Sequence, residues 1–120
     1  MNLVREKHLK REPVPDSIRC LQQYIEYSYT RPMTLDELCH TAGLSKYHLE
    51  REFKRYTGFS IMQYVIELRI NQACMLLAST DLPISQISDM AGFSDYPNFL
   101  KLFKSRKNMT PRQFRERHQN

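Results

Sequence analysis

Glycine is scarce in this chain, and several features that mark common protein classes are lacking. There are three glycines and no tryptophan in 120 residues, and no useful stretch alternates apolar with polar residues as a half-buried strand does. No apolar run approaches the roughly 20 residues that span a bilayer. The start, MNLVREKHLKREP, is basic and has no apolar core, so we expect no secretory signal. These absences favour an all-α protein that does not cross a membrane.

Cysteine is sparse as well. Cys20, Cys39 and Cys74 are an odd number without CxxC spacing, which fits a reducing cytoplasm better than a disulfide framework. We expect a cytoplasmic protein whose three thiols are buried or half-buried.

Patterns that would carry a metal or a reaction are also missing. Cys39–His40 with His48 invites zinc, but the separation does not match the C-x2-4-C or H-x3-5-H spacing of zinc ligands. We therefore predict no metal and no cofactor, and expect His48 to pack beside the core. The sequence shows no nucleophile–base arrangement, no P-loop and no paired carboxylates on a glycine-framed loop. An enzyme is not expected.

Positive charge is in excess and unevenly placed. The formal net charge is +5, and basic residues concentrate in the first dozen positions and again after Lys101. A basic balance favours a polyanionic partner, with nucleic acid first and an anionic membrane second. By itself it is weak evidence, because many basic surfaces are only solvated.

Turn signals and apolar spacing predict two helices after a flexible basic arm over residues 1–15. Asp16 is the expected N-cap of the first helix, and Pro32 is expected to end it. Thr34 should cap the second, with Glu37 completing a capping box. Apolar residues at helical spacing mark the inward faces: Ile18, Leu21, Tyr24 and Ile25, then Leu35, Leu38 and Ala42.

A short glycine-bearing turn, Ala42–Gly43–Leu44–Ser45, then leads into a third helix. Such a turn between two helices is typical of the helix-turn-helix pattern. The third helix is predicted over residues 46–57, with Leu49 and Phe53 buried and Gly58 as its stop. A long fourth helix is predicted over residues 61–79, capped by Ser60 and about 30 Å long.

The sequence then repeats itself. GLSKYHLEREFK, beginning at Gly43, is followed by GFSDYPNFLKLFK, beginning at Gly92. Asn108 stands where Gly58 stood, as the next-best residue for a left-handed helix stop. Thr110–Pro111 matches Ser60–Ile61 as an N-cap with its first helical residue. We predict about seven helices in two helix-turn-helix subdomains, residues 16–59 and 80–120, joined by a linker helix over residues 60–79.

These residues resemble the DNA-binding domain of AraC/XylS-type transcription regulators over about residues 16 to 117. The stretch ISQISDMAGFSDYPNFLKLFKSRKNMTPRQFR is similar to the signature of that family, and SKYHLEREFKRYTGFS also fits. The resemblance is to the small stand-alone MarA/SoxS-type members. It implies a bacterial activator that binds an asymmetric site on double-stranded DNA as a monomer and contacts RNA polymerase. A DNA-binding fragment of a longer, ligand-sensing regulator is the competing interpretation.

The resemblance carries the base-reading positions of the family onto the outer face of the third helix, at Tyr47, Glu50 and Arg51. Arg51 suits guanine O6 and N7, Glu50 can accept from cytosine N4, and the Tyr47 ring can pack on a thymine methyl. Glu50 and Arg51 could instead form a solvated charge ladder with Glu52 and Arg55. The side chains expected at phosphates are Ser45, Lys46, Lys54 and Arg55.

The second recognition helix is expected to begin after Asp95 and to be less specific. Tyr96, Pro97 and Lys101 are its candidate base readers. Lys101 offers a point charge in place of the arginine fork, so we expect this helix to supply affinity and fit more than strict base choice. Leu100 could meet a thymine methyl or serve packing. The expected phosphate contacts are Asn98, Lys104 and Thr110.

Three further arginines and one other class of function stay open. Arg69 could contact a phosphate or form an internal ion pair with a carboxylate, and the structural interpretation is favoured. Arg112 and Arg115 could reach the DNA backbone or only solvate the end. A helical protein-binding adaptor with basic tails is the alternative from a different class. Affinity for duplex DNA that falls steeply with salt separates the two, because an adaptor lacks it.

Overall fold

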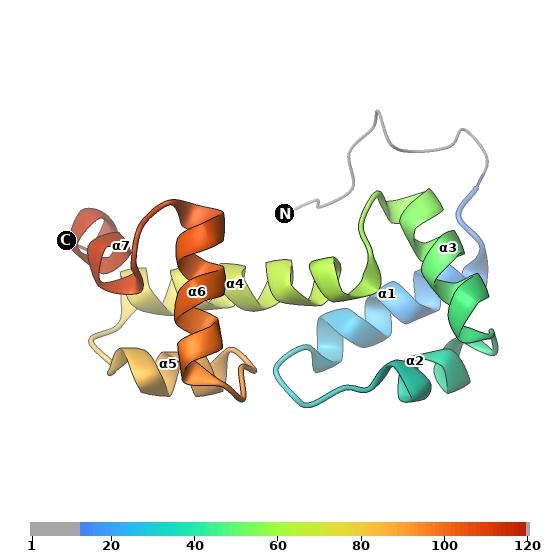
Figure 1. Cartoon of the computed structure of the whole chain (residues 1–120), viewed down its shortest axis with the longest axis horizontal. Coiled ribbons are helices and arrows are strands. Elements are labelled where there is room, and N and C mark those ends of the chain that lie inside the picture. The colour runs from blue at the N-terminus through green and yellow to red at the C-terminus, as the bar shows by residue number, and fades with distance from the viewer. Residues whose placement is uncertain (1–12, 120) are drawn as a thin grey trace. The chain divides into compact units, whose positions relative to one another are not determined.

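The computed structural model describes residues 13–119, and over that range it is all α-helical (Figure 1). This confirms the predicted fold class. Most of the predicted basic arm, residues 1–12, lies outside the described residues. None of the helices within residues 13–119 is long and apolar enough to cross a membrane. In chain order the helices are α1 (Asp16–Ser28), α2 (Leu35–Ala42), α3 (Lys46–Thr57), α4 (Ile61–Ser79), α5 (Ile84–Met90), α6 (Tyr96–Lys107) and α7 (Pro111–His118).

The chain folds as two compact units, each with its own core. The first unit contains the described residues up to Ser28 and Met33–Ile66, and the second contains Tyr29–Pro32 and the chain from Glu67 onward. The boundary falls within α4, so this helix supplies residues to both cores. The first core is built from Ile18, Leu21, Ile25, Leu38, Leu49, Phe53, Tyr56, Ile61, Tyr64 and Val65; the second from Ile70, Ala73, Leu76, Leu77, Ile87, Ala91, Phe93, Phe99 and Phe103.

The turns that precede α3 and α6 have matching hydrogen bonds. The Leu44 N–H donates to the Cys39 carbonyl at 3.2 Å, and the Phe93 N–H donates to the Ser88 carbonyl at 3.0 Å. The intervening glycine has a positive φ in each unit, 69° at Gly43 and 102° at Gly92. This is the Schellman arrangement, in which a left-handed residue lets the backbone satisfy the last carbonyls of the helix. The predicted helix-turn-helix repeat is therefore present in the backbone.

The N-termini of α4 and α7, the helices that follow α3 and α6, also match. The Ser60 hydroxyl accepts from the Gln63 N–H at 3.1 Å, while the Gln63 side chain accepts from the Ser60 N–H at 2.9 Å. Thr110 and Gln113 exchange the same two bonds at 3.1 and 2.9 Å. Each pair is a capping box that satisfies two N–H groups at a helix start. The predicted caps at Ser60 and Thr110 are confirmed.

Two predictions at the N-terminal end of the first unit need correction. Helix α1 begins at Asp16, and the carbonyl of Pro15 accepts from the Arg19 N–H at 3.0 Å, so Pro15 occupies the capping position that was predicted for Asp16. The helix also ends at Ser28, before Pro32. Of the predicted capping box on α2, the structure shows the Thr34 hydroxyl accepting from the Glu37 N–H at 3.1 Å.

Exposure corrects two further predictions. His48 is exposed on α3 and does not pack beside the core. Cys20 is exposed on α1, whereas Cys39 and Cys74 are partly buried as expected. His48 and Cys20 both lie on amphipathic helices where one further residue of rotation moves a side chain from the buried to the solvated face.

One buried polar atom stands out in the second unit. Ser88 on α5 is 1% exposed, and its hydroxyl has no hydrogen-bond partner among the described residues. A buried hydroxyl without a partner lowers stability, because it has lost its bonds to water. The repeat places Cys39, a weaker hydrogen-bonding group, at the matching position of α2.

Gly92 is packed against backbone, so we predict that Gly92→Ala is much more destabilising than Gly43→Ala. An added Cβ at Gly92 would lie 2.5 Å from the Tyr29 carbonyl oxygen and 2.9 Å from the Thr30 Cα, whereas one at Gly43 would have no atom within 4 Å. Gly43→Ala should cost about 1–2 kcal/mol for its left-handed backbone alone. Gly92→Ala should cost about 3 kcal/mol or more. Urea unfolding of both variants measures the difference, and equal losses would contradict the packing argument.

The Tyr64 hydroxyl predicts an alkaline loss of stability. Burial, and then the hydrogen bond to Glu26 at 2.6 Å, raise the pKa of Tyr64 above its usual value. Its contribution is complete below about pH 10, where the unfolded side chain titrates, and declines above that pH because only the unfolded state readily loses the proton. Tyr64→Phe should make the fall in unfolding free energy above pH 10 shallower. Tyr27→Phe is the control, because Tyr27 is 90% exposed; equal slopes in all three proteins would refute the assignment.

Candidate nucleic-acid interface

Helix α3 is held so that its outer face lies in solvent. Leu49 and Phe53 are fully buried, as predicted, and the Phe53 ring meets the Tyr64 ring edge-on with 5.4 Å between centroids. Edge-to-face ring contacts fix relative orientation as well as burying area. With these two side chains inward, the remaining faces of α3 carry the predicted contact residues Lys46, Tyr47, Arg51, Lys54 and Arg55, all exposed, and Glu50, half-buried.

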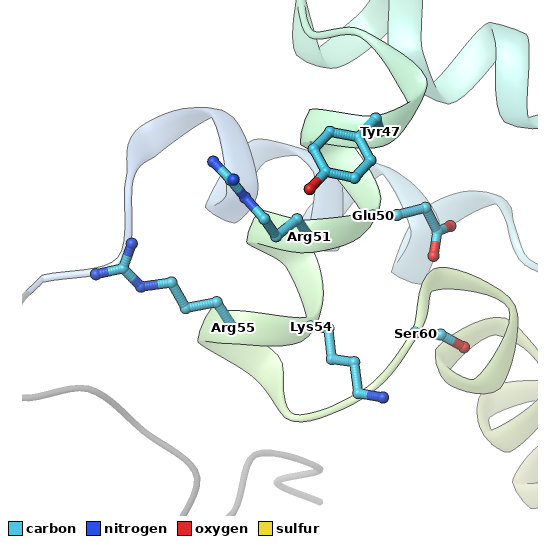
Figure 2. A pocket seen from close by; sticks show the side chains of 6 residues that line it. All are labelled: Tyr47, Glu50, Arg51, Lys54, Arg55 and Ser60. Carbon is cyan, nitrogen blue, oxygen red and sulfur yellow. The ribbon is translucent and has the colours of Figure 1, made fainter.

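The outer face of α3 forms one side of a shallow concavity of about 550 Å³ in the first unit. Figure 2 shows Arg51 and Arg55 projecting to one side of the helix, while Glu50 and Lys54 project toward Ser60 at the start of α4. The structure thus brings together residues that the sequence assigned to base reading with residues assigned to phosphate contact. The lining consists of Tyr47, Glu50, Arg51, Lys54, Arg55 and Ser60.

Charged side chains on α3 pair with one another. Glu52 lies 3.6 Å from Arg51 and 3.9 Å from Arg55, measured between nitrogen and carboxylate oxygen. The guanidinium of Arg51 also lies over the Tyr47 ring, 5.5 Å from its centroid. A charge ladder of Glu50, Arg51, Glu52 and Arg55 was one of the two interpretations left open by the sequence, and the structure shows the part that joins Glu52 to the two arginines. The contact between Arg51 and the Tyr47 ring was not predicted, although their i, i+4 spacing permits it.

The start of α3 offers two more candidate phosphate contacts. The Ser45 hydroxyl accepts from the His48 N–H at 3.3 Å and caps the helix. Its oxygen is therefore engaged, but its hydroxyl hydrogen remains able to donate. Lys46 follows it and is exposed. Both residues lie at the end where the helix dipole favours an anion.

Helix α6 is fixed in the second unit by the same kind of contact. Phe99 and Phe103 are fully buried, and the Phe103 ring meets the Phe114 ring edge-on at 5.7 Å. Asp95 caps the helix as predicted, by accepting from the Asn98 N–H at 3.1 Å. Leu100 is half-buried, which leaves both of its predicted roles open. The predicted contact residues Tyr96, Pro97, Asn98, Lys101 and Lys104 are exposed.

The two recognition helices differ in chemistry. Lys101 and Lys104 are the exposed cations along the middle of α6, while Arg106 turns back to Glu67 on α4, at 3.7 Å. Thr110, predicted at a phosphate, uses its backbone N–H and hydroxyl oxygen in the capping box with Gln113. Only its hydroxyl hydrogen is left to donate. The arginine-rich face belongs to α3.

Arg69 and Arg115 have structural roles within the second unit. Arg69 Nε donates to the Tyr29 carbonyl at 2.6 Å and its Nη2 donates to the Arg31 carbonyl at 3.1 Å. The structural interpretation of Arg69 is confirmed, but its partners are backbone carbonyls rather than a carboxylate. Burial lowers the pKa of its guanidinium from the usual value.

Arg115 was interpreted as a DNA contact or a solvated end, and the structure shows a third role, in which it is bonded within the chain. Its Nη2 donates to the Leu82 carbonyl at 2.7 Å and its Nε donates to the Leu77 carbonyl at 3.3 Å. Gln119 likewise donates to the Thr80 carbonyl at 2.6 Å. These two residues tie α7 to the end of α4 and to the loop that follows. The repeat could have indicated this role of Gln119. Gln119 is as far along the chain from the N-cap Thr110 as Arg69 is from the N-cap Ser60.

Metal-ligating side chains do not gather anywhere in residues 13–119, where no three His, Cys, Asp or Glu are placed to hold an ion.

The two exposed helices α3 and α6, each preceded by the same turn, define a double helix-turn-helix protein. Residues 38–117 match the family model of the helix-turn-helix domain, and the chain belongs to the AraC-type family of DNA-binding transcription regulators.

Bacterial relatives support the family. The probable transcription factor PqrA of Proteus vulgaris is 38% identical over 82 residues, covering 68% of this chain and 67% of PqrA. The bifunctional transcriptional activator/DNA repair enzyme AdaA of Bacillus subtilis is 32% identical over 107 residues, which cover 88% of this chain. The chain spans 51% of the length of AdaA. An AraC-type regulator structure from Chromobacterium violaceum matches with a TM-score of 0.77 and 33% identity, over 86% of this chain and 92% of that one.

Proposed function

We propose that this chain binds an asymmetric site on double-stranded DNA as a monomer, with α3 and α6 in successive major-groove segments, and activates transcription there. The concavity along α3 carries the proposal. One face of this packed helix presents four different chemical groups: the guanidinium of Arg51, the carboxylate of Glu50, the ring of Tyr47 and the ammonium of Lys54. An α-helix fits the major groove, where these side-chain types distinguish base pairs.

The roles of individual side chains follow from their chemistry and their place on the two helices. We assign base reading to Tyr47, Glu50 and Arg51 on α3 and to Tyr96, Pro97 and Lys101 on α6. Exposed or half-buried hydroxyls, amides and cations on these helices, or next to them in the chain, suit phosphate oxygens, which position a protein without reading sequence. These are Ser45, Lys46, Lys54, Arg55, Asn98, Lys104 and Thr110.

The length of α4 supports two readers in one chain. Its 19 residues correspond to about 28 Å, which is comparable to the roughly 34 Å between equivalent groove positions one turn apart. An asymmetric site is expected because the outer faces of α3 and α6 differ. No second copy of the chain is then required.

The activator role, an RNA polymerase partner and a cytoplasmic location belong to the same proposal. Activation is part of the name of AdaA, and a transcription activator acts at promoters, where RNA polymerase binds. The repair activity in that name is not proposed for this chain, which aligns with about half of AdaA.

Selection from a random duplex pool by the purified chain tests the proposal. We expect an enriched non-palindromic motif with two blocks about one helical turn apart, and an affinity that falls linearly with salt on logarithmic axes. Enrichment of one block would mean that α6 only grips the backbone. No enrichment, with no salt-dependent duplex binding, would refute DNA recognition and favour a protein-binding adaptor.

Arg51 and Lys104 form a matched pair of substitutions on that motif. Arg51→Ala should weaken binding by roughly 1–3 kcal/mol and relax the preference at one base pair, because a bidentate base contact is lost. Lys104→Ala should weaken binding to all duplexes alike and reduce the salt slope by about 1, because a phosphate contact is lost. Titration of the motif and of an unrelated duplex over several salt concentrations measures both. Identical behaviour of the two variants would contradict the division into base and phosphate contacts.

A further inference from the structure

We propose that Tyr47 and Glu52 are positioning residues that orient the Arg51 guanidinium for one base pair before DNA is bound. The inference rests on the proposed function and deepens it. It assigns the strict base choice of the protein to a group of three side chains on α3, one of which, Glu52, is not expected to touch DNA.

Glu52 is anchored in the protein more firmly than the arginines it pairs with. Its side chain is 18% exposed, against 56% for Arg51 and 43% for Arg55. One carboxylate oxygen faces Arg51 and the other faces Arg55. Because burial restricts the rotamers that a side chain can adopt, Glu52 is the less mobile member of both pairs. It therefore restrains the two arginines rather than following them.

The contact between Glu52 and Arg51 involves a particular atom. The measured pair joins the Glu52 carboxylate to Arg51 Nε, at 3.6 Å. Nε is the nitrogen nearest the aliphatic stem, so the two terminal nitrogens of the fork are not required for this contact. Adjacent residues on a helix do not face each other, and the Arg51 side chain must bend sideways to meet Glu52. Arg55, in contrast, meets Glu52 through a terminal nitrogen, Nη1, at 3.9 Å.

Tyr47 restrains the plane of the same guanidinium. The Arg51 Cζ lies 5.5 Å from the centroid of the Tyr47 ring, within the range of a cation–π contact. Figure 2 shows the ring and the arginine next to each other on one side of α3. Tyr47 is 73% exposed, so its ring is available as a platform for Arg51 and also for a base edge.

The two contacts together leave one edge of Arg51 for DNA. Guanine is read by two parallel hydrogen bonds from an arginine fork to O6 and N7, and this requires the plane and the edge of the guanidinium to be set. Tyr47 restrains the plane, and Glu52 occupies the Nε side. The terminal nitrogens remain for the base. Less side-chain freedom is then lost on binding than for an unrestrained arginine.

The second unit lacks all three members of this group. In the repeat, Pro97, Lys101 and Leu102 stand at the positions of Tyr47, Arg51 and Glu52. Lysine carries a point charge with no plane to align, and neither proline nor leucine can hold it. Strict base choice is therefore expected at the block read by α3 and relaxed choice at the block read by α6.

A double-mutant cycle on base preference tests the proposal. The readout is the ratio of affinities for the selected duplex and for duplexes altered at the base pair that Arg51→Ala relaxes. Glu52→Gln and Tyr47→Leu should each lower this ratio about tenfold, a typical coupling between contacting groups. Neither substitution should lower it further in the Arg51→Ala background. Tyr47→Phe should restore most of what Tyr47→Leu loses, because the ring is kept.

A matched control separates positioning from charge. Glu37→Gln removes an exposed carboxylate from α2 in the same unit. Like Glu52→Gln, it should raise affinity for all duplexes slightly, but it should leave the base preference intact. Undiminished base preference in Glu52→Gln and Tyr47→Leu, or equal losses with and without Arg51, would overturn the proposal.

A measurement without DNA makes the outcome independent of the proposed function. Arginine side-chain NMR of the free protein reports the mobility of each Nε–H group. Arg51 should be more restrained than the exposed Arg112, and Glu52→Gln or Tyr47→Leu should release it. If Arg51 is as mobile as Arg112 in the unaltered chain, positioning is wrong even where the chain selects a motif. If Arg51 is restrained but no motif is selected, the orienting contacts stand and the assignment of DNA recognition fails.

Discussion

An edge-on contact between two aromatic rings sets the orientation of each recognition helix. In the first unit the rings are Phe53 and Tyr64, and in the second they are Phe103 and Phe114. Each contact joins the buried side of a recognition helix to the helix that follows it, so the recognition helix cannot roll without losing packing. This constraint determines which side of α3 and of α6 faces solvent. Which side chains reach solvent is decided by which residues lie opposite the buried ring.

Local sequence signals predicted most of the fold. Helices α3 and α4 begin and end where the caps and stops indicated, and Gly58 and Asn108 have the left-handed backbone expected of helix stops. These signals are reliable because a cap or a left-handed residue acts on its own backbone, within one turn. The predicted burial of His48 and Cys20 was wrong, because both lie near the edge of an amphipathic stripe, where a small difference in helix rotation decides exposure.

Part of the candidate site could also be predicted. The stripe of Tyr47, Glu50, Arg51 and Lys54 follows from helical periodicity, and the structure places it along one concavity. The distant partners of long side chains could not be predicted. Arg115 and Gln119 reach backbone carbonyls more than thirty residues away. Such contacts depend on tertiary structure that spacing alone does not encode.

The unpartnered hydroxyl of Ser88 has a consequence for how this protein can change over evolutionary time. Specificity changes when residues of an exposed helix are replaced, and many such replacements reduce stability. Ser88 is buried on α5 and belongs to neither α3 nor α6. An apolar residue of similar size there would remove an unsatisfied group and raise stability without altering any side chain on those two helices. The fold thus holds a reserve of stability that allows new binding preferences to arise in a chain that still folds.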